Sequence, residues 1–375
     1  MARTLPRFAP LFVLSLVALI ALPFAATAQS ATDAGRFRVD ASWPEPLPNN
    51  WILGQVSGMA TDPEDHVWVL QRPLSLTDDE HGATFSPPLS KCCSPAPPVL
   101  EFDTAGRLLH SWGGPAKGYD WPQNEHGIYV DAEGFVWITG NGEQDGQVLK
   151  FKSDGTFVMQ IGKVGPQTGD ADTSRMGQPA GIAVDVAANE VYVADGYFNH
   201  RIIVFDAKTG AFHRTWGAFG KSPDGSDKPN LRRTAPPTAA QLTHFGNPVH
   251  CVRIANDGLV YVCDRLNDRI QIFRKDGTFV KEFSIEPQTA GNGSVWDIVF
   301  SRDPEQRWLY IADGRNNQLL TVSRATGEVR ATTGAPGRNA GYFHWVHDMA
   351  IDSNGNVYTG EVDTGKRIQK FVVQP

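Results

Sequence analysis

Three histidines stand at equivalent positions of a pattern that recurs along this 375-residue chain. They are His126, His250 and His347, and each lies five residues ahead of the residue that opens the first tight turn of its repeat. Three imidazoles with a fourth position left open are the ligand set of a catalytic zinc site rather than of a closed structural one. The alternative is that each histidine only forms a hydrogen bond to a neighbouring element. We predict a metal site built from the three repeats.

The elements that must position these histidines are short strands. Six copies of the pattern fill most of the chain, and the clearest copy is residues 179–217, "PAGIAVDVAANEVYVADGYFNHRIIVFDAKTGAFHRTWG". A copy has about 40 to 50 residues and four alternating apolar stretches, which is typical of a propeller blade. Apolar residues at helical spacing are nearly absent. The sequence therefore predicts an all-β, six-bladed β-propeller.

The two ends of the chain complement each other in this pattern. The sixth copy lacks its fourth strand, because the chain stops at Pro375 soon after the third one, "RIQKFVV". Residues 35–43, "GRFRVDASW", resemble the closing strands of other copies, such as "GAFHRTW". An N-terminal strand that completes the last blade would close the ring and leave no open sheet edges.

The first 28 residues have the composition of a signal peptide. Arg3 and Arg7 precede an uncharged run that contains "LFVLSLVALIAL", and Ala26-Thr27-Ala28 has the small-residue pattern of a cleavage site. A retained membrane anchor is the alternative, but the apolar run is interrupted by prolines and is short for a membrane span. We expect a protein that is secreted or periplasmic and free of the membrane once this segment is removed.

The remaining residues, 29–375, are expected to form one propeller domain. Two longer segments interrupt the repeats: an insertion at residues 73–98 in blade one, and a loop at residues 218–245 between blades three and four. The insertion either forms a lid over one face or only decorates it. Loss of residues 1–28 changes the formal net charge from −7 to −9. An acidic protein of this kind is a poor partner for nucleic acid or for an anionic membrane.

The four cysteines do not by themselves define a disulfide framework. Cys251 and Cys263 flank the turn "ANDG" and are expected to lie opposite each other, either bonded or free. Cys92 and Cys93 are adjacent inside the insertion, and because vicinal cysteines bond only with strain, their state stays open.

The first strand of every propeller blade lines the central channel, so one repeat position forms a ring around the axis. From blade one to blade six this ring consists of Ser57, His126, Ala180, His250, Trp296 and His347. Histidine occupies every second blade. Alternate blades of six are related by about 120°, so the three imidazoles are able to converge on one ion.

Three charged or phenolic residues follow the second strands of their blades, which return to the face where the first strands begin. They are Arg72, Tyr197 and Arg265. Two arginines beside a cation indicate an anionic substrate, since a guanidinium matches a carboxylate with two hydrogen bonds. A tyrosine near a metal ion and arginines has its phenolate form favoured, which suits a general base.

Other arginines of the repeats have a structural explanation. Arg201 and Arg269 stand at one blade position, in "NHRI" and "NDRI", and are expected to brace the turn residues Asp195 and Asp264. Arg265 has the same structural explanation as an alternative to a role in the site.

The phrases "LGQVSGMATD", "DGYFNHRI", "CDRLNDRIQIF" and "VHDMAID" resemble the peptidyl-α-hydroxyglycine α-amidating lyases, on a background of NHL-type blades. The resemblance covers almost all of the chain after residue 28. It implies a zinc enzyme that splits a peptidyl-α-hydroxyglycine, a substrate with a carboxylate, into a peptide amide and glyoxylate. A separate hydroxylating monooxygenase would supply that substrate.

The resemblance also assigns individual residues. The family's zinc histidines fall on His126, His250 and His347, its catalytic tyrosine on Tyr197, its essential arginine on Arg72 and a second active-site arginine on Arg265. A structural calcium ion is implied as well, bound by the side chain of Asp348 and by the backbone carbonyls of Val56 and Ile128. A carboxylate beside two carbonyl oxygens suits this hard cation.

The chain departs from the family at several positions. Trp345 stands where the family has methionine, two residues before the last zinc histidine, and Phe198 and Ile272 replace two of its disulfide cysteines. A bulkier site would favour a different substrate for the same chemistry. Two other functions remain as alternatives. One is a metal-dependent hydrolase such as a six-bladed lactonase, which would favour a carboxylate-rich calcium centre, and the other is a non-enzymatic NHL-repeat binding protein.

Overall fold

The chain divides into two units, and all the strands that the structure describes lie in the second of them. The computed structural model describes residues 1–2, 35–223 and 232–374. Its contacts divide the chain into Met1–Asp33 and Ala34–Pro375, and the strands all lie in the second unit. The predicted signal peptide, residues 1–28, lies outside the described residues except at its first two positions. None of the helices in the described ranges is long and apolar enough to cross a membrane.

The described part of this second unit contains six antiparallel sheets of four strands. Blade one consists of β3 (Gln55–Thr61), β4 (Val67–Arg72), β6 (Val99–Phe102) and β7 (Leu108–Trp112). Blade two consists of β8 (Glu125–Val130), β9 (Val136–Gly140), β10 (Gln147–Phe151) and β11 (Phe157–Gly162). Blade three consists of β12 (Pro179–Asp185), β13 (Glu190–Asp195), β14 (Arg201–Asp206) and β15 (Phe212–Trp216).

The second half of the chain repeats this arrangement. Blade four consists of β16 (Val249–Ile254), β17 (Val260–Asp264), β18 (Arg269–Phe273) and β19 (Phe279–Ser284). Blade five consists of β20 (Asp297–Phe300), β21 (Trp308–Asp313), β22 (Gln318–Ser323) and β23 (Val329–Thr333). Blade six consists of β24 (Val346–Ile351), β25 (Val357–Glu361), β26 (Ile368–Gln374) and β1 (Arg36–Asp40).

The first strands of the blades form a closed ring. β3 contacts β8, and the contacts continue through β12, β16, β20 and β24 back to β3. The helices in the described part of the chain are all single 3₁₀ turns: η2 (Pro48–Asn50), η3 (Pro73–Ser75), η4 (Gly82–Thr84), η5 (Ala218–Gly220), η6 (Gln241–Thr243) and η7 (Arg265–Asn267). The predicted all-β, six-bladed β-propeller is confirmed.

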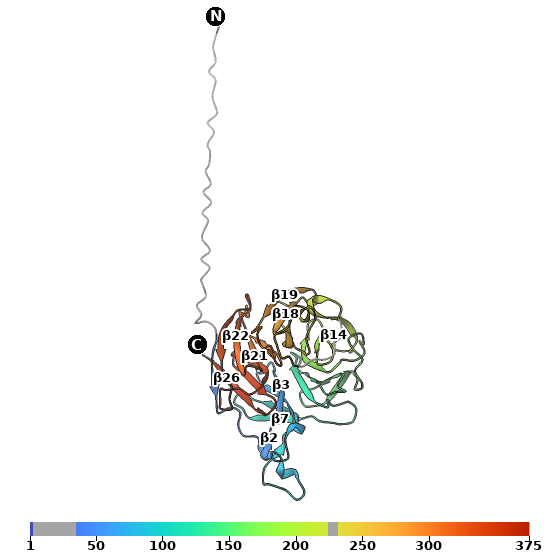
Figure 1. Cartoon of the computed structure of the whole chain (residues 1–375), viewed down its shortest axis with the longest axis vertical. Helices are drawn as coiled ribbons and strands as arrows, with labels where there is room; N and C mark the ends of the chain where they lie inside the picture. Colours follow the sequence, from blue (N-terminus) through green and yellow to red (C-terminus); the bar gives the residue numbers. More distant parts are fainter. Residues whose placement is uncertain (3–34, 224–231, 375) are drawn as a thin grey trace. The chain divides into compact units, whose positions relative to one another are not determined.

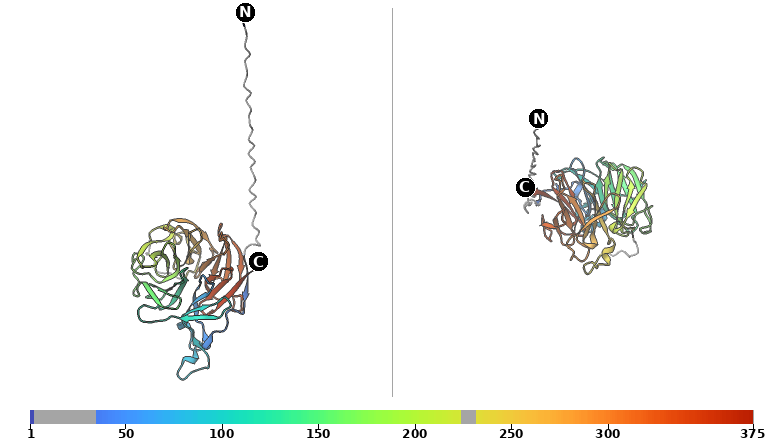
Figure 2. Two further views of the ribbon diagram at one scale, coloured as in Figure 1. Left: turned by 180° about the vertical axis from the view of Figure 1, so that it is seen from behind. Right: turned by 90° about the horizontal axis from the view of Figure 1, so that it is seen from above.

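The N-terminal strand completes the last blade. β1 pairs with β26 from Arg36 opposite Gln374 to Asp40 opposite Lys370. In Figures 1 and 2 the blue N-terminal strand accordingly lies beside the red C-terminal strands. The observed strand is shorter than the predicted segment 35–43, because a turn begins after Asp40.

Aspartates in the first turn of a blade hold its hairpin together. Asp131 Oδ1 accepts the backbone N–H of Phe135 at 3.0 Å, and its Oδ2 accepts the indole N–H of Trp137 at 2.8 Å. Gly134 adopts φ 81° in this turn, a left-handed conformation that glycine tolerates without strain. The same aspartate-to-aromatic contact recurs in blades one and six, from Asp62 to Trp68 and from Asp352 to Tyr358.

Apolar side chains fill the space between neighbouring blades. Val69 of blade one packs in one buried cluster with Tyr358 of blade six, and Trp137 of blade two packs with Ile203 of blade three. Because each blade buries both of its faces in this way, the ring provides a rigid support for side chains at its axis.

The predicted bracing arginines are confirmed. The Nε of Arg201 donates to Asp195 Oδ2 at 2.7 Å, and the Nε of Arg269 donates to Asp264 Oδ2 at 2.7 Å. All four side chains are buried. A buried charge of this kind is stable only with a paired and hydrogen-bonded partner.

Both cysteine pairs are bonded. Cys251 lies directly opposite Cys263 in the register of β16 and β17, and their sulfurs form a disulfide. Cys92 and Cys93 form a second disulfide within the insertion. The insertion, residues 73–98, projects from blade one (Figure 1) and contains β5 (Ser94–Pro95), which pairs with β2 (Trp51–Ile52).

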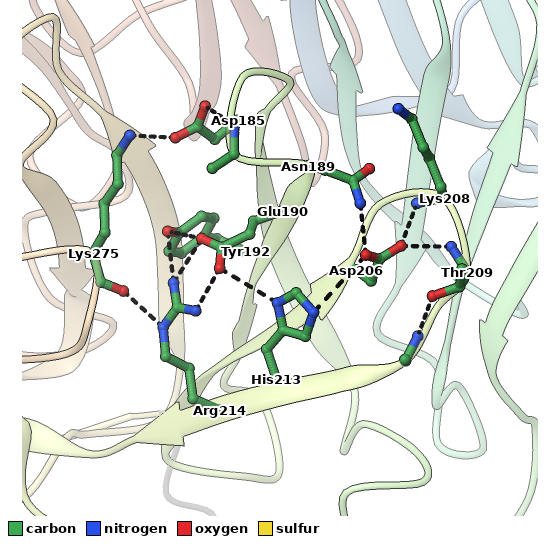
Figure 3. A network of polar contacts seen from close by, with 12 residues as sticks. Asp185, Asn189, Glu190, Tyr192, Asp206, Lys208, Thr209, His213, Arg214 and Lys275 are labelled. Atoms are coloured by element: carbon green, nitrogen blue, oxygen red, sulfur yellow. Dashed lines mark hydrogen bonds and ion pairs between the residues drawn. The ribbon is translucent and has the colours of Figure 1, made fainter.

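An ion pair ties the strands of blade three together. Arg214 of β15 donates two hydrogen bonds to Glu190 of β13, at 2.5 and 2.7 Å, as Figure 3 shows. Its Nε also donates to the carbonyl of Lys275 in blade four, at 2.7 Å. The hydrogen bonds from Arg214 lower the pKa of Glu190 from 4.5 to about 2.

We expect Glu190→Gln to lower the free energy of unfolding at pH 7 by roughly 1–3 kcal/mol, the usual contribution of hydrogen bonds to a charged group. Because the folded-state pKa of Glu190 is depressed, its contribution is present above pH 4.5 and is lost as the pH falls towards 2. Urea unfolding at pH 7 and pH 3 measures the difference. Glu64→Gln, at an exposed turn position, is the control. An equal difference at both pH values would contradict the prediction.

Candidate metal centre

The three ring histidines converge at the axis of the propeller. His126, His250 and His347 are each the second residue of the first strand of a blade, β8, β16 and β24. One ring nitrogen of each lies within 4.8 Å of those of the other two. The ring centroids are 4.9, 4.9 and 4.8 Å apart, so the triangle is nearly equilateral. Their exposed fractions are 1–2%. This is the threefold arrangement that the repeat predicted.

A break in strand pairing directs each histidine to the axis. In β16 the register passes from Val249, opposite Asp264, to Cys251, opposite Cys263, and so omits His250. In β24 it likewise omits His347, between Val346 and Asp348. A β-bulge of this kind leaves the extra residue unpaired and turns its side chain away from the regular alternation.

Backbone carbonyls of the blades without histidine orient the imidazoles. The Nδ1 of His347 donates to the carbonyl of Ser57 at 2.9 Å, and the Nδ1 of His250 donates to that of Trp296. His126 is buried beside the Ala180 carbonyl without a well-aligned hydrogen bond. Ser57, Trp296 and Ala180 are the other members of the ring. A bond at Nδ1 fixes the tautomer, so that Nε2 is left as the acceptor that binds a metal ion.

The surroundings keep the imidazoles neutral. Burial, reinforced by the positive charges nearby, lowers the pKa of all three histidines well below 6.5. Among the neighbouring charges are Arg72 and Arg265. Neutral imidazole is the form that coordinates a metal ion, and three of them suit zinc.

The hydroxyl of Tyr197 lies against the triad. It is 3.0 Å from the Nε2 of His126 and 3.2 Å from the Nε2 of His250. Arg265 Nη1 donates to the same oxygen at 3.1 Å. The phenolic oxygen therefore lies beside the point on which the imidazoles converge, within reach of a proton on a group bound there.

Arg265 is buried beside the triad and has no bracing function. It follows β17, in η7, and its guanidinium carbon lies 4.5 Å from the ring centre of Trp296. The alternative was that Arg265 braces the turn residue Asp264. Asp264 instead accepts a hydrogen bond from the Nε of Arg269. The Nε of Arg265 is buried without a hydrogen-bond partner.

Arg72 is held entirely by neutral acceptors. It donates to the backbone carbonyl of Glu125 at 2.7 Å, to Gln55 Oε1 at 2.8 Å and to Asn141 Oδ1 at 3.4 Å. Within the described part of the chain, neither this guanidinium nor that of Arg265 forms an ion pair with a carboxylate. Two such cations beside a metal site leave a positive centre that an anionic ligand would neutralise.

Gln55 and Asn141 are site residues that the sequence analysis missed. Asn141 follows "VWITG" at the position that Arg72 and Arg265 occupy in their own blades, so alignment of the repeats would have found it. Gln55 opens β3 directly opposite Arg72 of β4, and its contact with Arg72 follows from that pairing.

The residues proposed for calcium lie in the first strands close to the ring positions. Val56 and Ile128 are buried in the first strands of blades one and two, with 0% and 4% exposed. Asp348 follows His347 in β24, and its Oδ1 accepts the backbone N–H of Met59 at 3.1 Å.

An arginine already lies beside this carboxylate. Arg253 Nη2 is 2.8 Å from Asp297 Oδ1 and 3.8 Å from Asp348 Oδ1. Burial and the neighbouring Asp297 raise the pKa of Asp348 well above its ordinary value. Arg253 thus lies beside both carboxylates and already supplies one positive charge at the place where the family resemblance implies a calcium ion.

A cavity of about 590 Å³ opens at the opposite ends of the first strands from the histidines. Its lining includes Thr61, Asp131, Arg253, Asn256, Arg302 and Ile351. It contains none of the three histidines, Tyr197 or Arg72. We place the candidate site at the histidines, because that end joins metal ligands to an acid–base group and two unpaired cations.

Comparison with known proteins agrees with the fold. An NHL repeat model matches residues 176–205. This segment contains β12, β13 and all but the last residue of β14 in blade three. The solved structure of a streptogramin B lyase superposes with a TM-score of 0.52, covering 92% of this chain and all of that chain, at 14% sequence identity. A likeness at this identity supports the propeller fold alone.

Two curated relatives bear on the chemistry. The chain is 28% identical over 340 residues to peptidyl-glycine alpha-amidating monooxygenase B of Xenopus laevis, covering 86% of this chain and 34% of that protein. It is 28% identical over 290 residues to peptidyl-alpha-hydroxyglycine alpha-amidating lyase 1 of Drosophila melanogaster, covering 69% of this chain and 47% of the relative. The chain thus spans about a third of the length of the monooxygenase. It is similar, at low identity, to proteins of the amidating lyase type.

Proposed function

We propose that this protein is a zinc-dependent carbon–nitrogen lyase that cleaves peptidyl-α-hydroxyglycine or a similar N-acyl hemiaminal into an amide and glyoxylate. One observation carries the proposal: the Tyr197 hydroxyl lies 3.0 and 3.2 Å from two of three converging, neutral imidazoles. A binding protein has no need of an acid–base group at that point. The similarity to amidating lyases supports the same reaction.

His126, His250 and His347 would hold the metal ion through their Nε2 atoms. Zinc suits three neutral imidazoles and an open fourth position. When bound, such an ion polarises an oxygen ligand and lowers the pKa of a hydroxyl group on it.

Arg72 would bind the substrate carboxylate and Tyr197 would move the proton. Tyr197, whose oxygen accepts a hydrogen bond from Arg265, removes the proton of the α-hydroxyl group. The alkoxide electrons then form the aldehyde C=O as the C–N bond breaks. The amide nitrogen leaves with the bonding pair and receives a proton from Tyr197. No water molecule adds, so the products are one amide and one glyoxylate.

The assay for this proposal is release of glyoxylate and amide from a synthetic N-acyl-α-hydroxyglycine. We expect one of each per substrate consumed, loss of activity in the metal-free protein and its return with zinc. Metal analysis should find about one zinc ion per chain. A zinc-loaded protein that binds the substrate but releases no glyoxylate would exclude the lyase reaction. A protein that retains no metal after zinc-replete preparation would support a non-enzymatic scaffold.

Arg72→Gln is expected to raise KM about 30- to 100-fold, because it removes a bidentate, charge-assisted contact to the carboxylate. Its neutral partners, Gln55, Asn141 and the Glu125 carbonyl, leave the guanidinium free to pair with the substrate. Steady-state kinetics measure the change.

The methyl ester of the same substrate is the matched control for Arg72. The ester lacks the negative charge, so wild type and Arg72→Gln should process it with similar kcat/KM. An equal loss on both substrates would show that Arg72 only supports the structure.

Calcium is expected to have no effect on the wild-type melting temperature, since Arg253 already supplies a positive charge beside Asp297 and Asp348. Arg253→Gln should melt lower and should regain stability in millimolar calcium. Thermal unfolding with calcium and with a chelator compares the two proteins. A calcium-dependent rise in the wild type would restore the calcium site implied by the family resemblance.

The substrate of such a lyase is made by oxidation of a glycine α-carbon, so a separate hydroxylating monooxygenase remains the predicted supplier. Secretion or export to the periplasm, through cleavage after residue 28, likewise stays a prediction.

A further inference from the structure

Trp345 adopts a backbone conformation that is unusual for a bulky residue. Its φ is 58°, in the left-handed region that favours glycine. Two hydrogen bonds hold it there: its N–H donates to Asn317 Oδ1 at 2.6 Å, and its carbonyl accepts the N–H of Val362 at 3.1 Å. Strained residues that the surroundings hold so firmly are concentrated at functional sites.

The strained residue is joined to the metal centre by aromatic contacts. The ring centroids of Trp345 and Trp296 are 5.3 Å apart. Trp296 in turn lies 5.6 Å from His347 and 6.0 Å from His250, measured between ring centroids. The Arg265 guanidinium carbon lies 4.5 Å from the same indole. A series of aromatic contacts therefore joins the histidines to Trp345.

Trp296 is fixed and serves as the support of this surface. It is 3% exposed, and its indole N–H donates to the carbonyl of Gly293 at 2.7 Å. A Cβ atom on Gly314 would lie 2.5 Å from Trp296, so only glycine leaves room for the indole in this position. Trp345, by contrast, is half-buried.

We propose that Trp345 is a specificity-determining residue that selects an aromatic acyl group on the substrate, and that Trp296 positions both Trp345 and Arg265. The inference rests on the proposed function for one point, the anchoring of the substrate carboxylate by the site arginines. With the carboxylate and the reacting carbon held at the metal centre, the acyl group extends away from it. A planar acyl group that reaches the half-buried Trp345 gains a stacking contact that a small acyl group does not.

Binding of two stable analogues tests the proposal without turnover. N-Benzoylglycine and N-acetylglycine share the carboxylate and the amide and lack the reactive hydroxyl group. By titration calorimetry with the zinc-loaded protein, we expect N-benzoylglycine to bind about tenfold more tightly. Trp345→Leu should bring the two affinities close together, and Trp345→Phe should keep most of the preference.

Trp308→Leu is the matched control variant. Trp308 is also half-buried and packs against the apolar cluster that contains Trp296. It is the first residue of β21, at the end of that strand away from Asp313 and the site. This variant should keep the tenfold preference.

Similar affinities of the two analogues in the wild type, or an unchanged preference in Trp345→Leu, would overturn the proposal. A preference that disappears only in Trp345→Leu would establish it even if no glyoxylate were released. In that case the proposed lyase function would fail while the proposed role of Trp345 in specificity would hold. Failure of the one proposal is therefore distinguishable from failure of the other.

Discussion

Tyr197→Phe is expected to lower kcat by about 100- to 10,000-fold, the usual contribution of a general acid–base group. The substitution removes only the phenolic oxygen, which lies 3.0 Å from the Nε2 of His126 and accepts from Arg265 at 3.1 Å. The imidazoles keep their backbone partners, so zinc content should stay near that of the wild type. Glyoxylate release at saturating substrate measures the effect.

Tyr192→Phe is the control for this substitution. Tyr192 lies in the same blade, but its hydroxyl contacts Glu190 of β13 and Arg214 of β15 instead of the metal centre. Its removal should leave kcat within a few-fold of the wild type. If Tyr197→Phe retained a normal kcat, another group would have to move the proton, and the mechanism would fail at its central step.

His126→Ala is expected to abolish both zinc retention and activity. Each imidazole supplies one of only three protein ligands, and two ligands with water do not hold zinc against a chelator. We expect metal content to fall from about one ion per chain to near zero. Elemental analysis of the dialysed protein measures the zinc content, and glyoxylate release measures the activity.

His344→Ala provides a matched comparison. His344 lies three residues before His347, outside β24, and its Nε2 contacts Thr364 rather than the triad. This variant should retain zinc and activity. Full zinc content in His126→Ala would mean that the ion, if present, is bound elsewhere.

Much of the fold could be predicted because each blade repeats its own local pattern. Alternating apolar stretches recur in the copies of the pattern, and the structure forms them into the strands of the blades. Completion of the last blade by residues 35–43 followed from the same comparison, since an unpaired edge is unfavourable. The contacts of Arg201 and Arg269 could also be predicted, because their partners Asp195 and Asp264 lie only a few residues away in the sequence.

The surroundings of the site were harder to predict because they join different blades. Asn141 of blade two meets Arg72 of blade one, and no local pattern specifies that contact. The contact between Arg253 of blade four and Asp348 of blade six also joins different blades. The positive charge of Arg253 is the reason that we expect no stabilisation by calcium. Such contacts depend on how the blades close around the axis.

The sequence by itself determined which residues share a level of the ring, since His126, His250 and His347 occupy one repeat position in alternate blades. Only the tertiary structure decided that their side chains meet. A bulge omits His250 and His347 from the strand register, and backbone carbonyls of the following blades bind the Nδ1 atoms. The physical reason is that a side chain's direction in a strand depends on pairing, and an imidazole's orientation depends on a partner supplied by another blade.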